Sequence, residues 1–359
     1  MLSQILLLLF ILSLWGIKVK QDGFWEDNLA LPQCNAIKGI SIALILVGHG
    51  VGYFYRSSSF NPLFLPNRLS LLVLHRLIGQ LMVVMFLFYS GYGLMESLKK
   101  KGDTYLKHFP RMRLLKTWLN FAVAVCVFSV LALLVGDHIS LGHFTLALIG
   151  WDSVGNSNWY VFVILVCYLL FYLAFHPRAP WKRFDTSLAV LGIFTVVFII
   201  CLWFARPDEV WWYNKTMIFP LGVAFSLYRE KWQPFINRHY AVFTMTILSL
   251  LLLHYVFYLV FRESNPNTAV PYHIRSALFA MSVVLVTRKI RILNPALVWL
   301  GEHIFPIYIY QRIPMRILYV ALGADTLSAH VLLYYVVCVV VTVAIAWAYR
   351  FFEIKLSPR

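Results

Sequence analysis

Charged residues are scarce in this chain of 359 residues, because Asp, Glu, Lys and Arg together make up only 13% of it. A soluble protein carries about a quarter. Strict alternation of apolar and polar residues is also missing, which argues against a membrane β-barrel. No segment between apolar runs is long enough for a separately folded soluble domain. What remains is a chain that is 61% hydrophobic, with apolar runs of about 20 residues recurring from end to end. The sequence therefore predicts an all-α integral membrane protein, a polytopic bundle of about 10–11 transmembrane helices.

Paired cysteines and metal-binding patterns are missing as well. The five cysteines are odd in number and scattered, no CxxC pair occurs, and four of them lie in apolar runs. There is no HExxH pattern and no His/Cys pair at ligand spacing. We therefore expect no disulfide framework, no metal site and no permanently bound cofactor.

The apolar runs predict eleven membrane spans. The first, Leu2–Ile17, has no basic residue before it, whereas Lys18 and Lys20 follow it, so we interpret it as a retained span and not as a cleaved signal peptide. The other ten are Ala36–Tyr55, Ile78–Leu98, Leu114–Val135, Asn158–Phe175, Asp185–Phe204, Thr216–Tyr228, Tyr240–Phe261, Tyr272–Thr287, Glu302–Leu322 and His330–Phe352.

The basic residues orient these spans. The net charge of +16 would suggest nucleic acid in a soluble protein, but here the Lys and Arg residues gather in alternate loops. If the loop after Leu98 is cytoplasmic, the inside segments hold 21 of the 31 basic residues and the outside loops hold seven. Such an excess marks the cytoplasmic side of a membrane protein. The pattern predicts a multi-pass protein of the plasma or inner membrane with a cytoplasmic C-terminus, an outside N-terminus and no nucleic-acid partner.

The span Ala36–Tyr55 contains two ionisable residues, Lys38 and His49. They are eleven positions apart, which places them on one helix face within roughly 20° of each other and about 16 Å apart along the axis. Ser41 and Gly48 lie close to the same face. Because an ionisable group at membrane depth is costly, this stripe is predicted to face a protein interior and to be functional.

Six segments, taken in order, resemble the motifs of the membrane acyltransferase family three. The first is the Lys38-(ten residues)-His49 pair, which is similar to the family's Arg-(ten residues)-His signature. The other five are MFLFYSGYGL (Met85–Leu94), RMRLLKTW (Arg111–Trp118), NWYVFVILVCYLLFYL (Asn158–Leu173), LGEHIFPIYIYQ (Leu300–Gln311) and YRFFEIK (Tyr349–Lys355).

The resemblance implies a membrane O-acyltransferase that moves an acyl group, most simply acetyl, from acyl-CoA to a hydroxyl of a cell-envelope glycan or glycolipid sugar. It also implies a ten-span domain over residues 36–359, with residues 1–35 as an extra transmembrane segment and cytoplasmic linker. Two residues depart from the family pattern. Lys38 replaces an Arg, and Gln311 stands where the family often has His.

These inferences give each candidate residue a role. A neutral imidazole is the usual base for a hydroxyl, so His49 is the predicted general base, and Lys38 at the cytoplasmic end of its helix faces the donor. Phosphates of acyl-CoA need cations, and the thioester oxyanion needs hydrogen-bond donors. The predicted donor-binding residues are Arg111, Arg113, Lys116, Ser90 and Tyr92. The predicted acceptor-binding residues are Trp159, Tyr160, Gln311, Arg312 and Arg316, and Trp159 and Tyr160 are also candidate oxyanion donors.

Each role has a structural alternative. His49 can bond a neighbouring backbone carbonyl, and Lys38 can extend to the membrane interface. The basic residues of the loop after Leu98 can serve topology alone, and Arg312 and Arg316 can pair with an acidic group. The whole protein can instead be an exporter or flippase of glycan precursors, or a non-catalytic component of a glycan synthase complex. The bilayer is a partner in every case, and the sequence leaves the oligomeric state open.

Overall fold

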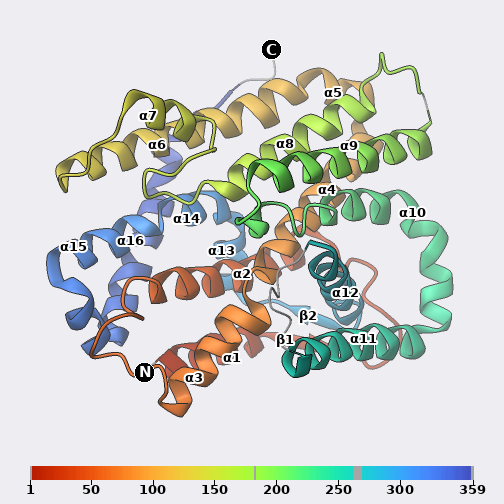
Figure 1. Cartoon of the computed structure of the whole chain (residues 1–359). Helices are drawn as coiled ribbons and strands as arrows, with labels where there is room; N and C mark the ends of the chain where they lie inside the picture. Colours follow the sequence, from red (N-terminus) through yellow and green to blue (C-terminus); the bar gives the residue numbers. More distant parts are fainter. Residues whose placement is uncertain (1, 182, 262–268, 357–359) are drawn as a thin grey trace. The chain divides into compact units, whose positions relative to one another are not determined.

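The structure is a computed structural model that describes residues 2–181, 183–261 and 269–356 (Figure 1). Three of the basic residues counted above, Lys182, Arg262 and Arg359, lie outside this range. The chain forms two compact units, each assembled from distant parts of the sequence. Unit 1 comprises Met1–Met82, Leu119–Trp159 and Lys289–Ile354, and unit 2 comprises Val83–Trp118, Tyr160–Arg288 and Lys355–Arg359.

Unit 1 contains the predicted His49 helix and the C-terminal helices. Its elements are α1 (Leu2–Leu14), β1 (Ile17–Val19), α2 (Leu31–Val51), α3 (Leu65–Leu71), the π-helix η1 (Leu72–Ile78), most of α6 (Lys116–Leu134), α7 (Leu141–Leu148), β2 (Ile290–Ile292), α13 (Pro295–Glu302), α14 (Ile304–Tyr310), α15 (Arg312–Ala329) and α16 (Val331–Phe352).

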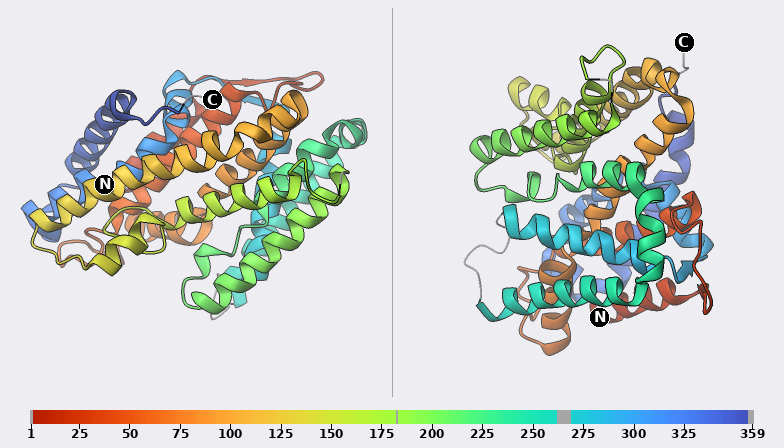
Figure 2. Two further views of the ribbon diagram at one scale, coloured as in Figure 1. Left: turned by 90° about the horizontal axis from the view of Figure 1, so that it is seen from above. Right: turned by 90° about the vertical axis from the view of Figure 1, so that its right-hand side faces the viewer.

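Unit 2 is built around α4 (Leu81–Lys101) and the central part of the chain. Its other elements are α5 (Asp103–Phe109), the π-helix η2 (Pro110–Leu115), α8 (Trp159–Phe175), α9 (Phe184–Ala205), the short 3₁₀ helix η3 (Val210–Trp212), α10 (Ile218–Arg238), α11 (Tyr240–Phe261) and α12 (Ala269–Val286). Within it, α11 and α12 pack side by side, as Figures 1 and 2 show.

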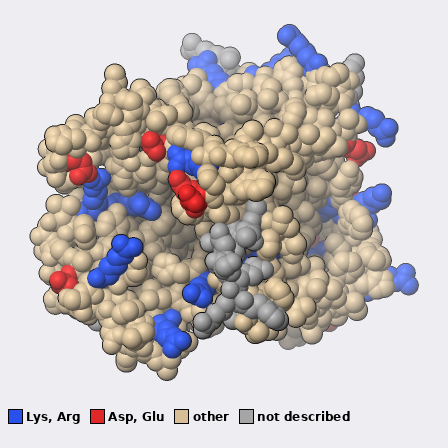
Figure 3. All heavy atoms as spheres, viewed as in Figure 1, with Lys and Arg blue, Asp and Glu red and all other residues tan. Residues whose placement is uncertain are grey.

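Both units contain long apolar helices. Within the described residues, six helices are long and apolar enough to cross a membrane: Leu31–Val51, Leu65–Lys101, Asp103–Leu134, Phe184–Ala205, Tyr240–Tyr258 and Val331–Phe352. Three shorter apolar helices cover Leu2–Leu14, Trp159–Phe175 and Val270–Val286. Large apolar side chains on these helices are exposed, for example Leu252 at 64%, and charged residues are few on the face in Figure 3. An apolar exterior suits lipid contact. The all-α polytopic fold class is therefore confirmed.

The predicted span Ala36–Tyr55 corresponds to α2, which begins at Leu31 and ends at Val51, and two other spans differ more strongly from the structure. The stretch 302–322 is not one helix, because α13 ends at Glu302, α14 ends at Tyr310 and α15 follows. Proline has no N–H to bond the carbonyl four residues earlier. Pro306 therefore leaves the Glu302 carbonyl without its helical partner, and Pro314 does the same to Tyr310. The second span, 216–228, belongs to α10, which continues to Arg238. The predicted span ended at Tyr228 because hydropathy falls at the charged residues that follow, whereas the helix does not stop there.

Contacts inside unit 1 agree with the predicted alternation of sides. Strands β1 and β2 pair antiparallel, with Lys18 opposite Arg291, and the charge pattern places both segments in the cytoplasm. The sequence had not predicted these strands. At the opposite side, Ser57 Oγ donates to Asp325 Oδ1 at 2.6 Å, and both residues lie in segments predicted outside. The orientation itself remains a prediction.

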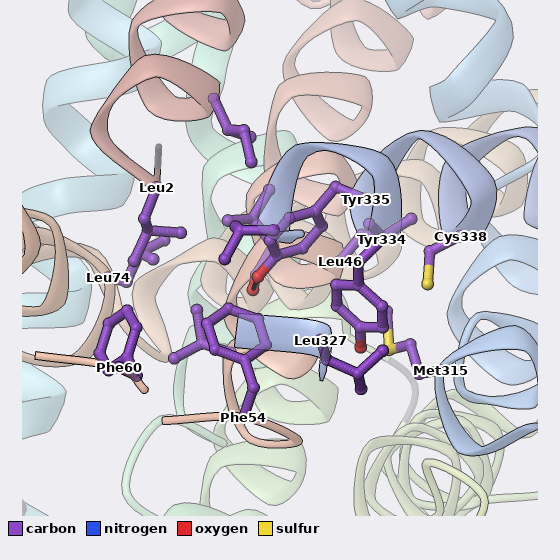
Figure 4. Close-up of a cluster of buried hydrophobic side chains, with 14 residues drawn as sticks. Leu2, Leu46, Phe54, Phe60, Leu74, Met315, Leu327, Tyr334, Tyr335 and Cys338 are labelled. Carbon is purple, nitrogen blue, oxygen red and sulfur yellow. Dashed lines mark hydrogen bonds between the residues drawn. The ribbon is translucent and has the colours of Figure 1, made fainter. Parts of the chain in front are cut away.

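Helix α2 owes its position to two glycines. A Cβ added to Gly39 would collide with the Leu297 carbonyl oxygen of α13, and one added to Gly301 would collide with the Asn35 carbonyl oxygen of α2. Small residues let two helix backbones approach this closely in a membrane. Beyond the crossing, the α2 residues Leu46, Val47 and Val51 enter the apolar cluster drawn in Figure 4, which α1, α15 and α16 also line.

Candidate functional site

His49 lies two residues before the last residue of α2. Two adjacent tyrosines of α16 add hydrogen bonds to backbone carbonyls at this end of the helix. Tyr335 donates its hydroxyl to the Val47 carbonyl at 2.7 Å, and Tyr334 donates to the Gly50 carbonyl at 3.3 Å. The missing side chain of Gly50 leaves room for the Tyr335 ring. Helix α16 therefore holds the end of α2 that carries His49.

The surroundings of His49 come from α14 and α15. The ring of Tyr308 lies with its centroid 6.4 Å from that of His49, tilted by 55°. Arg312 is close enough to act electrostatically on the imidazole. The Nδ1 atom of His49 is buried and forms no hydrogen bond with any residue that the structure describes. This nitrogen therefore does not bond a described backbone carbonyl, which was the structural alternative for His49.

Gln311 lies between Tyr308 and Arg312 in sequence and is completely buried. Its Nε2 donates to the Tyr308 carbonyl at 3.1 Å, while its Oε1 is buried without a hydrogen-bond partner in the described part of the chain. Buried polar atoms are nearly always bonded in proteins. His49 Nδ1 and Gln311 Oε1 are thus two buried polar atoms without a bond to a described residue. Both are near Tyr308, whose ring lies beside His49 and whose carbonyl accepts from Gln311.

Arg316 connects α15 to the loop after α6. Its guanidinium forms an ion pair with Asp137 and donates from Nη1 to the Val154 carbonyl at 3.1 Å. The same group lies against Gly155, which has φ of +103° and leaves no room for a Cβ. The predicted pairing of Arg316 with an acid is thus present. Both Arg312 and Arg316 also act electrostatically on Tyr53, so one face of α15 carries both cations.

Lys38 lies at the other end of α2. It interacts electrostatically with Glu302, the last residue of α13, and with Cys34. Glu302 also accepts a long hydrogen bond, 3.4 Å, from Asn35 Nδ2. Lys38 therefore has an acidic neighbour that the sequence had not suggested, and it is separated along α2 from His49.

The predicted donor-binding residues all belong to unit 2. Ser90 lies close enough to Tyr168, and Arg113 close enough to Tyr105, for each pair to interact electrostatically. Tyr92 accepts a hydrogen bond of 2.9 Å from Arg229 Nη1. Arg111 is exposed and Lys116 half-buried. Tyr160, predicted for the acceptor, also belongs to unit 2, where its ring meets Phe86 at 5.9 Å, whereas Trp159 is the last residue of its segment in unit 1.

Sequence reasoning missed a pair of arginines in unit 2. Arg288 is buried, and Arg229 lies near enough to act on it. Burial, and then the Arg229 guanidinium, lower the pKa of Arg288 below its ordinary value. Both had been counted only as topology determinants. Tyr308, Glu302 and Asp137 were missed because their partners lie far away in sequence.

The fold and this site define a polytopic α-helical membrane protein with a buried histidine beside a tyrosine and an arginine. A family model described as an acyltransferase domain matches residues 31–351. The chain therefore belongs to the acyltransferase-3 family, as its motifs suggested, and is a membrane acyltransferase. No curated protein and no solved structure matches the chain.

Proposed function

We propose that the protein is an O-acyltransferase that transfers an acyl group, most simply acetyl, from acyl-CoA to a hydroxyl of a cell-envelope glycan or glycolipid sugar. The observation that supports it best is the buried Nδ1 of His49, which bonds no residue within the described ranges, beside Tyr308 and Arg312. A base needs a ring nitrogen that no other group already occupies. Family membership supplies the reaction class, and the sugar acceptor follows from the resemblance of the motifs.

In the proposed reaction, His49 takes the proton of the acceptor hydroxyl as its oxygen attacks the thioester carbonyl. The C–O bond forms, the carbonyl electrons move to the oxygen, and a tetrahedral oxyanion results. This oxyanion collapses and the C–S bond breaks with its electron pair on sulfur. His49 returns its proton to that sulfur, so coenzyme A leaves as the thiol and the imidazole is neutral again. Arg312, a fixed positive charge beside the imidazole, is the group we assign to stabilising the oxyanion.

We assign the donor's phosphates to the basic residues of unit 2. Arg111, Arg113 and Lys116 follow α5, and the half-buried Arg229 and the buried Arg288 add two neighbouring cations that the sequence had not singled out. Two guanidinium groups held close together repel each other, and a phosphate between or beside them would relieve that repulsion. Ser90 and Tyr92 are the neutral donors proposed for the same substrate, and Lys38 the cation of α2 that faces the donor.

The acceptor is proposed to meet Gln311, Arg312 and Arg316. Gln311 Oε1 is a buried acceptor that a sugar hydroxyl can satisfy. Arg316 is already bonded to Asp137 and Val154, so we assign it to holding the loop over residues 136–157 and not to direct contact. Trp159 and Tyr160 keep their proposed role as aromatic contacts for the sugar.

The test is mass spectrometry of envelope glycans from cells with and without the protein. The proposal expects an ester mass that depends on the protein and disappears in His49→Ala. His330→Ala, which changes an exposed histidine of the same unit, is the matched control, and membrane abundance is measured for both. Ester retained in His49→Ala would overturn the base assignment. Loss of exported glycan without any change in ester would instead favour a flippase or exporter.

A further inference from the structure

The connection between α2 and α4 carries positive charge on the side of the membrane where few basic residues are expected. Residues 52–80 contain Arg56, Arg68 and Arg76 and no Asp or Glu. These are three of the seven basic residues in the loops that the charge pattern predicts outside. Topology therefore does not account for three arginines in one outer segment that has no acidic residue.

The same segment exposes large apolar side chains. Leu63 is 81% exposed, and Phe64, Leu65 and Leu69 are each more than half exposed. On α3, Leu65, Arg68 and Leu69 are spaced i, i+3 and i+4, so they share one helix face, and Arg68 is exposed as well. An apolar surface that also carries a cation is typical of an element that lies in the plane of a membrane interface.

Side-chain hydrogen bonds give the loop before α3 a defined shape. Asn61 Oδ1 accepts from the backbone N–H of Leu63 at 2.9 Å and from that of Phe64 at 3.2 Å. Asn67 Nδ2 donates to the Asn61 carbonyl at 2.9 Å and so ties the loop to α3. A hydrogen-bonded turn of this kind therefore holds Leu63 and Phe64 at the surface.

The segment is packed against unit 1 near the His49 end of α2. Helix α3 lies beside α1, as Figure 1 shows, and Leu74 of η1 belongs to the apolar cluster that contains Val51, the last residue of α2. Helix α1 also exposes large apolar side chains, among them Leu7 and Leu8. The exposed residues of α3 thus adjoin a helix whose own surface suits lipid contact.

We propose that α3 and the loop before it form an interfacial anchor that docks into the headgroup region of an anionic phospholipid bilayer. Its side chains are Leu63, Phe64, Leu65, Arg68 and Leu69. The apolar side chains lie at the boundary between headgroups and acyl chains, while the long side chain of Arg68 reaches the phosphates. Positive charge without acidic neighbours favours an anionic headgroup over a neutral one. This contact goes beyond acyl transfer and is measurable without turnover.

The experiment measures the surroundings of Leu63 in the full-length protein. Leu63→Cys is labelled with a nitroxide in a background without the exposed Cys126 and Cys201, and the protein is placed in phosphatidylglycerol nanodiscs. Collisions of the label with oxygen, which partitions into lipid, are compared with collisions with a water-soluble nickel chelate. We expect the oxygen-to-nickel ratio to be several-fold higher than at Ser153→Cys, an exposed polar position of the same unit. Equal ratios at the two positions would overturn the proposal.

A second comparison tests the preference for anionic lipid. The ratio at the Leu63 label should be higher in phosphatidylglycerol than in phosphatidylcholine, and Arg68→Gln should abolish this difference. Arg178→Gln, which changes an exposed arginine of unit 2, is the control and should keep it. No difference between the lipids, or a difference that survives Arg68→Gln, would contradict the proposal. Spin–spin coupling between labels on two copies of the chain would show that a second copy covers this surface, and would also overturn it.

Discussion

The hydroxyl of Tyr335 donates a 2.7 Å hydrogen bond to the backbone carbonyl of Val47, two residues before His49. The two residues are separated by most of the chain. With the neighbouring bond from Tyr334 to Gly50, this contact makes the first turns of α16 the support for the candidate base. The orientation of His49 therefore depends on a helix that no motif near His49 identifies.

Gly50 provides the first test of that support. In Gly50→Ala the new Cβ would lie 2.6 Å from a ring carbon of Tyr335, so the ring or α2 must shift. We expect a loss of about 1–3 kcal/mol of stability, typical of overpacking, together with reduced acyl transfer. Gly48→Ala is the control for stability, because its Cβ meets nothing within 4 Å. Thermal unfolding in detergent compares the two, and an equal melting temperature would contradict the role given to Tyr335.

The crossing of α2 and α13 gives a second prediction. Gly39→Ala and Gly301→Ala each place a Cβ on a backbone carbonyl of the other helix, which cannot rotate away as a side chain can. Each variant should unfold at a lower temperature than wild type and reach the membrane in smaller amounts. Gly192→Ala in α9, where the added Cβ meets nothing within 4 Å, should leave both quantities unchanged. Normal stability of both crossing variants would show that the helices are farther apart.

The loop over residues 136–157 is expected to loosen when Arg316 is replaced. Arg316→Gln loses the ion pair with Asp137, whose side chain is 55% exposed, so the global cost should be small, about 0–1 kcal/mol. Local hydrogen exchange in the loop should nevertheless rise several-fold, since two anchoring contacts depend on this one side chain. Arg76→Gln, which changes an exposed arginine of unit 1, is the control. Unchanged exchange in Arg316→Gln would contradict the anchoring role.

Asp325 predicts a pH dependence of stability. Hydrogen bonds from Ser57 and then Ser58 lower the pKa of its carboxyl, so the folded state favours the ionised form. This contribution is fully present above the unfolded pKa of about 3.9 and is lost as pH falls through the lowered folded value. Between pH 6 and pH 3, Asp325→Asn should therefore lose less thermal stability than wild type, whereas Asp22→Asn, an exposed control, should follow wild type. Parallel curves for Asp325→Asn and wild type would refute this.

The orientation of the chain is testable by cysteine labelling. In a background without exposed Cys126 and Cys201, Ser153→Cys should react with a membrane-impermeant maleimide in intact cells. Lys100→Cys should react only after the membrane is opened, because the basic loop after α4 is predicted to be cytoplasmic. The reverse pattern would invert the topology and with it the assignment of donor and acceptor sides.

Hydropathy and charge were sufficient for the fold class, because membrane insertion depends on local apolar length that any window of sequence reports. They were not sufficient for the helix boundaries. The prolines Pro306 and Pro314 were visible in the sequence, yet the apolar run across 302–322 concealed the breaks that they cause. The charged end of α10 produced the opposite error, since hydropathy stops at the charges and the helix continues.

The sequence by itself determined that this chain is a polytopic helical membrane protein of an acyltransferase family, and it singled out His49, Arg312 and Arg316. Only the tertiary structure decided which residues lie beside them and beside Lys38. Its contacts are Tyr308 and Arg312 with His49, Asp137 with Arg316, and Glu302 with Lys38. Span and motif signals are local in sequence, whereas each of these contacts joins segments that lie far apart along the chain and meet only when helices pack.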